Sequence, residues 1–80
     1  MIEVHCRLTE KGYVFHEPST PDKVVGSVSN DFPEEGLVVS PYTVRRIVKV
    51  LTGKTMEGIL QEGIRVTYAD GTEAMSIQPE

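Results

Sequence analysis

Apolar and polar residues alternate strictly near the start of the chain, from position 2 to position 8. The alternation places the apolar side chains on one face and the charged or polar ones on the other, which is typical of a half-buried strand. A glycine then permits a tight turn, and residues 13–17 are predicted to form the returning strand. Two registers stay open for this hairpin, because Leu8 lies opposite Phe15 with a two-residue loop and opposite Val14 with a three-residue loop.

A second alternating stretch, residues 64–68, precedes Asp70 and Gly71, which form one of the strongest two-residue hairpin signals. With these two residues in the loop, Val66 lies opposite Met75, and the apolar side chains of both strands share one face. A shift by one residue would turn one strand's apolar side chains to the other face, so the pattern specifies this register.

The middle of the chain carries the clearest helical pattern. Apolar residues recur at i, i+3, i+4 and i+7 between Val44 and Leu51, Ser40 is a candidate N-cap, and a proline follows it at the first helical position. A helix over about 41–52 is therefore predicted, ended by a glycine. A second, shorter helix is predicted over 55–62, between a capping threonine and a closing glycine.

Residues 24–28 allow two interpretations. A threonine, a proline and an aspartate just upstream would cap a short helix, but the sequence Val-Val-Gly-Ser-Val is poor helical material and favours a strand. The strand is the preferred prediction. Prolines and small polar residues predict loops on both sides, over 18–23 and 29–36, where surface-borne functional residues are often found.

Together these elements predict an α+β fold, in which an antiparallel sheet is built from N- and C-terminal hairpins and covered on one face by the helix pair, about 41–52 and 55–62. The segregation of strands and helices along the chain argues against a doubly wound parallel sheet. Eighty residues leave room for a single small domain, 1–80. The last residues, 78–80, are expected to fray.

Charge is distributed unevenly along the chain. Twelve acidic and eight basic residues give a net charge of -4, which disfavours nucleic acid as a partner without forbidding a local basic patch. No acid occurs between positions 35 and 57, whereas four basic residues do. At about 100° per residue, one tyrosine and three of these cations lie opposite the apolar stripe of the first helix: Tyr42, Arg45, Arg46 and Lys49.

These four residues have the chemistry of an anion-binding surface, because tyrosine stacks on rings while Arg and Lys bind phosphate or carboxylate oxygens. We therefore predict a non-enzymatic binding or regulatory module whose ligand or partner is anionic: a nucleotide, a nucleic acid or an acidic protein surface. Phage-type inhibitors and sequestering proteins are similar to this chain in small size and acidity. The similarity is one of general type and rests on no matched residue. The competing interpretation is that these residues are only the solvated outer face of an amphipathic helix.

Other chemical motifs in the chain are less specific. Gly53-Lys54-Thr55 is similar to the end of a phosphate-binding loop, but the glycine required five positions earlier is absent. An alternative prediction is a small enzyme whose site is assembled only in the fold, with the candidates His5, Cys6, His16 and Glu17. Strand alternation separates His5 from Cys6, so we predict neither a metal site nor a cofactor. A structural subunit of a larger complex is a further alternative.

The cysteine content bears on the compartment. A single cysteine excludes an internal disulfide, which fits a reducing environment. No apolar run has the length of a signal peptide or a membrane helix, and we therefore expect a cytoplasmic protein without membrane contact.

An open sheet edge predicts self-association. The C-terminal hairpin has a weakly polar second face, on which Arg65, Thr67, Ala74 and Ser76 are expected to lie. We predict a homodimer or a higher symmetric oligomer that uses this hairpin.

Overall fold

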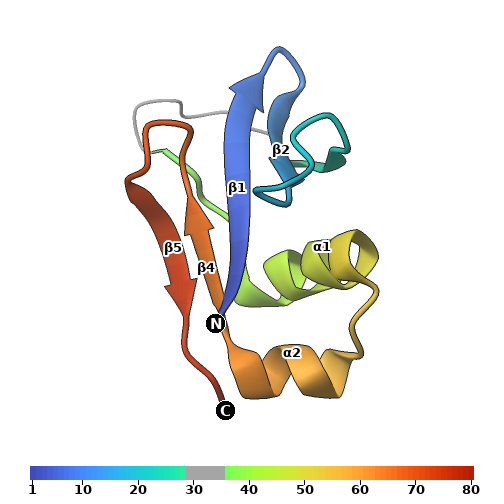
Figure 1. Cartoon of the computed structure of the whole chain (residues 1–80). Coiled ribbons are helices and arrows are strands. Elements are labelled where there is room, and N and C mark those ends of the chain that lie inside the picture. The colour runs from blue at the N-terminus through green and yellow to red at the C-terminus, as the bar shows by residue number, and fades with distance from the viewer. Residues whose placement is uncertain (29–35) are drawn as a thin grey trace.

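Five strands and two helices make up the described part of the chain, residues 1–28 and 36–80 of a computed structural model (Figure 1). The strands form one sheet in the order β3-β2-β1-β4-β5, and both helices lie against one of its faces. The predicted α+β class is confirmed. In chain order the elements are β1 (Ile2–Thr9), β2 (Gly12–His16), β3 (Val25–Val28), α1 (Pro41–Thr52), α2 (Met56–Glu62), β4 (Ile64–Thr67) and β5 (Glu73–Ile77).

The two terminal hairpins join through a parallel pair, β1 with β4, in which Ile2 lies opposite Ile64 and Val4 opposite Val66. The sheet is therefore mixed, whereas the hairpins alone predicted antiparallel pairing throughout. The reason lies in the connection: β3 and β4 both run parallel to β1, and parallel strands need a long crossover, which the helix pair provides.

The first hairpin adopts neither of the two predicted registers. Leu8 lies opposite Tyr13 and Cys6 opposite Phe15. Gly12 is itself the first residue of β2, with φ 113°, and its carbonyl oxygen accepts a hydrogen bond of 2.7 Å from the Thr9 hydroxyl. Because the glycine belongs to the strand, the two-residue loop consists of residues 10 and 11, and the partner of Leu8 is one residue earlier than in the nearer of the two predicted registers.

In the second hairpin the predicted pairing of Val66 with Met75 is confirmed. An irregularity between Val66 and Thr67 then shifts the register, so that Thr67 lies opposite Glu73. Ala74 packs partly buried against the hydrophobic core, and its predicted place on the second face is therefore wrong.

Both helices are confirmed, with the predicted caps. The Ser40 hydroxyl accepts a hydrogen bond of 3.2 Å from the Thr43 amide, and the Thr55 hydroxyl accepts one of 3.1 Å from the Gly58 amide. Gly53 ends α1 with φ 74°, in the left-handed region. The preferred strand at 24–28 is confirmed as β3, which pairs with β2.

The C-terminus is held in place, because the Glu80 amide donates a hydrogen bond of 2.8 Å to the Leu60 carbonyl oxygen. The expected fraying of 78–80 is therefore wrong at its last residue. The predicted loop 29–36 lies outside the described residues except for Gly36. Within the described ranges, no helix combines the length and the apolar content that a membrane crossing requires.

Gly63, between α2 and β4, has φ 74° and ψ 172°, a conformation open essentially to glycine alone. A Cβ atom built there would lie 2.7 Å from the Ile77 carbonyl oxygen, whereas at Gly53 it would meet no described atom within 4 Å. We expect Gly63→Ala to lower the free energy of unfolding by about 3 kcal/mol and Gly53→Ala by about 1 kcal/mol, as measured by urea denaturation. Equal losses would contradict this account of the close approach.

Candidate functional site

Helix α1 divides sharply into a buried and an exposed side. Its four core residues follow the apolar stripe read from the sequence: Val44, Ile47, Val48 and Leu51. On the opposite side Tyr42 is 63% exposed and Val50 is 68% exposed. The buried stripe fixes the helix against the sheet, so the exposed side chains are held on a rigid element.

Three of the four predicted binding residues gather around one hollow of about 450 Å³, and α2 completes it. The guanidinium carbon of Arg46 lies 5.8 Å from the centroid of the Tyr42 ring, within cation–π range. We call this the α1 hollow, and it is lined by Tyr42, Arg46, Lys49, Val50 and Met56.

Arg45, the fourth predicted residue, does not line the α1 hollow. Its Nη2 atom lies 3.4 Å from the Glu80 Oε1 atom, and its side chain is only 19% exposed. On a helical wheel Arg45 sits at the edge of the outer face, where the C-terminal segment reaches it. The structure thus assigns Arg45 to an ion pair at the C-terminus.

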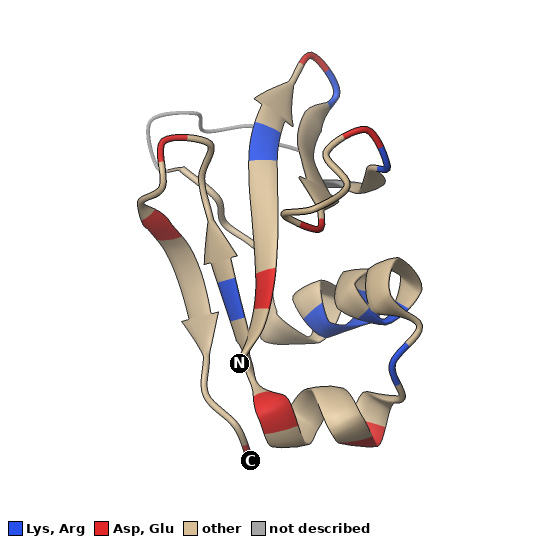
Figure 2. Cartoon of the chain, viewed as in Figure 1, with Lys and Arg blue, Asp and Glu red and all other residues tan. Residues whose placement is uncertain are grey.

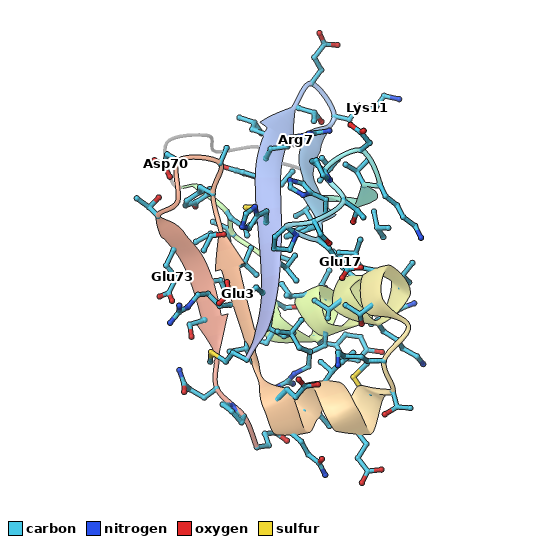
Figure 3. All side chains as sticks on the ribbon, in the orientation of Figure 1. Glu3, Arg7, Lys11, Glu17, Asp70 and Glu73 are labelled. Carbon is cyan, nitrogen blue, oxygen red and sulfur yellow. The ribbon has the colours of Figure 1, made fainter. Side chains whose placement is uncertain are left out.

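Ion pairs also neutralise two other cations of the described chain, Lys54 and Arg65. Lys54 Nζ lies 3.0 Å from Glu62 Oε2, across the two ends of α2. On the side of the sheet away from the helices, Arg65 lies between Glu73, at 3.3 Å, and Glu3, at 3.8 Å. Figure 3 labels the two glutamates, on β5 and β1. These exposed pairs stabilise the fold only weakly, but they remove positive charge from those surfaces.

Arg46 and Lys49 form no ion pair with any acid among the described residues. Figure 2 shows basic positions along α1 and its connection to α2, while the acids lie on α2, on the strands and in the loops. The α1 hollow therefore carries local positive charge on a chain of net charge -4.

Val50 and Met56 belong to the hollow but were not predicted from the sequence. Val50 is an apolar residue on the outer face of an amphipathic helix, which is a readable signal, whereas the approach of Met56 depends on how α2 packs. A second hollow of about 280 Å³ adjoins the first, because both are lined by Arg46 and Val50. The remaining walls of this second hollow are Val25, Thr43 and Ile47.

The residues proposed for an enzyme are split between the two faces of the sheet. His5 and His16 lie opposite each other with ring centroids 5.5 Å apart, and the His16 Nδ1–H group donates to the Glu17 backbone carbonyl oxygen at 2.9 Å. Cys6 lies on the other face, opposite Phe15 in the core. The described residues contain no group of three or more His, Cys, Asp or Glu side chains arranged to hold a metal ion.

The buried thiol and its neighbours are poorly suited to nucleophilic chemistry. Cys6 is fully buried, and burial raises the pKa of its thiol from 9.0 to about 11. Burial also raises the pKa of Tyr13, with a further contribution from Tyr68, whose ring centroid lies 6.1 Å away. Neither group is ionised near neutral pH, which leaves the core free of charge.

Comparison with known protein families, with curated proteins and with solved structures finds no match to this chain. Its function must therefore be argued from its own residues.

The Cys6 thiol should be protected in the native protein. A pKa raised from 9.0 to about 11 lowers the thiolate fraction at pH 8 by about 100-fold, and burial excludes reagent as well. We expect iodoacetamide to alkylate Cys6 at least about 100-fold more slowly in the native state than in urea, as followed by mass spectrometry. Because the pKa of Cys6 is higher in the folded than in the unfolded protein, its contribution to the free energy of unfolding is fully present below pH 9.0. This contribution is lost as the pH rises through about 11. Similar native and denatured alkylation rates would contradict this burial.

Proposed function

We propose that the protein is a non-enzymatic binding or regulatory module, and that the α1 hollow engages an anionic ligand or partner. The observation that carries the proposal is that Arg46 and Lys49 share this hollow with Tyr42 while no described acid pairs with either cation. A reducing compartment, the cytoplasm, suits a chain whose one cysteine is a buried thiol.

The chemistry of the three side chains supports an anionic occupant. Arg46 can bind a carboxylate or phosphate through two parallel hydrogen bonds, and Lys49 adds a mobile point charge. Tyr42 provides an amphipathic ring at the same place. A local basic surface on a chain of net charge -4 also orients an approaching anion, since acidic surfaces elsewhere repel it. Such a module would act by covering or sequestering its partner.

Charge reversal in the α1 hollow tests the proposal. We expect Arg46→Glu with Lys49→Glu to weaken binding to fluorescent poly-L-glutamate, or to an oligothymidylate, by about tenfold, because two attractive contacts become repulsive. Fluorescence anisotropy measures the affinity, and circular dichroism checks the fold.

The matched control is Arg7→Glu with Lys23→Glu, which changes the net charge equally at exposed positions on β1 and in the loop before β3. We expect this control to stay within about twofold of the original affinity. Equal weakening by both pairs of substitutions, or no binding of either polymer by the unaltered protein, would contradict the proposal.

We also propose that the protein self-associates through its C-terminal hairpin. Strand β5 forms one edge of the sheet, so its outer backbone groups lack a strand partner within the described chain. Sedimentation equilibrium at micromolar concentration should give at least twice the mass of one chain. Ser76→Lys on β5 should shift the protein toward monomer, while Gln61→Lys on α2 should not. A monomeric unaltered protein would exclude this assembly.

A further inference from the structure

We infer that the occupant of the α1 hollow is an acidic, amphipathic helical segment of another protein. This inference rests on the proposed function and names the class of partner. The observation behind it is one continuous surface that combines two cations, which pair with no described acid, with the exposed apolar side chain of Val50.

The apolar component comes from both helices and from the sheet edge. Val50 is 68% exposed at the centre of the surface, because it lines both hollows. Met56 extends the apolar wall toward α2, and Val25 and Ile47 extend it toward β3. A ligand bound only through charge would leave the exposed Val50 side chain in water, whereas a partner with apolar residues would bury it.

The charged component has helical spacing. Arg46 and Lys49 are three positions apart on α1, a rise of about 4.5 Å along the helix axis. Two acidic residues one turn apart on a partner helix, at i and i+3 or i+4, have nearly the same spacing. A helix lying along α1 therefore meets both cations at once and places an apolar residue beside its acids against Val50, which follows Lys49 along α1.

Nucleic acid fits this surface less well. The phosphate-binding device of helices is a free N-terminus, but the Ser40 hydroxyl already accepts from the Thr43 amide at the start of α1. A nucleic-acid backbone running beyond the hollow would also meet a chain of net charge -4. A peptide segment whose acidic residues are confined to the part that faces Arg46 and Lys49 meets less of this repulsion.

The test uses a fluorescent peptide of about fifteen residues, long enough to form a helix, with glutamates one turn apart around leucine and phenylalanine. A matched peptide carries serine in place of the leucine and phenylalanine. We expect the amphipathic peptide to bind at least about tenfold more tightly than the serine peptide. Val50→Ser should weaken its binding by about fivefold without affecting the serine peptide.

Val38→Ser is the matched control, because Val38 is 67% exposed and lines neither hollow. It should leave both affinities within about twofold, as measured by anisotropy. If both peptides bind equally and Arg46→Glu with Lys49→Glu weakens both, the anionic site stands and the inference of an amphipathic partner is wrong. If that double substitution changes neither affinity, the proposed function is wrong as well.

Two further outcomes would show that a different class of partner occupies the α1 hollow. Displacement of the peptide by an oligothymidylate that binds more tightly would assign the surface to nucleic acid and overturn the inference. A dimer that sedimentation equilibrium detects and that Val50→Ser abolishes would assign the surface to a second copy of the chain. This result would also overturn the inference.

Discussion

Val4 and Val66 lie side by side at the centre of the sheet, both fully buried, where β1 and β4 pair in parallel. Because β3 runs in the same direction as β4, the chain between them must cross one face of the sheet, and the two helices make this crossing. The stripe of α1 that contains Val44 and Val48 then packs on the core that β1 and β4 provide. The parallel pair thus unites the two hairpins and determines that the opposite side of α1 faces outward.

The sequence predicts those parts of the fold that depend on local chemistry. Ser40 and Thr55 cap the helices because their hydroxyl groups satisfy amides within one turn, and this needs no distant partner. The direction of β4 relative to β1 is different, since alternation of side chains is the same in parallel and antiparallel strands. The predicted registers of the first hairpin were wrong for a related reason. The sequence pattern does not show whether Gly12 is a loop residue or the first residue of a strand.

The candidate site also has a part that local sequence predicts and a part that depends on distant segments. The helical wheel correctly places Tyr42, Arg46 and Lys49 together, because their relative positions depend only on α1 itself. Arg45 lies outside the hollow because it pairs with Glu80, a residue from the C-terminal segment that was expected to fray. Met56 was missed for the same reason, since its position follows from the packing of α2 on α1.

The outer face of α1 departs from what helix stability alone would favour. Arg45 and Lys49 are spaced i, i+4, and Arg46 and Lys49 i, i+3, and like charges at these spacings destabilise a helix by about 0.2–0.5 kcal/mol per pair. Glutamate in place of Arg45 or Arg46 would form a favourable pair with Lys49, and the chain has twelve acids. Val50 adds an exposed β-branched residue, which has lower helix propensity than leucine or lysine. Local choices that oppose stability are expected at functional sites, and these coincide on the surface that the proposed function uses.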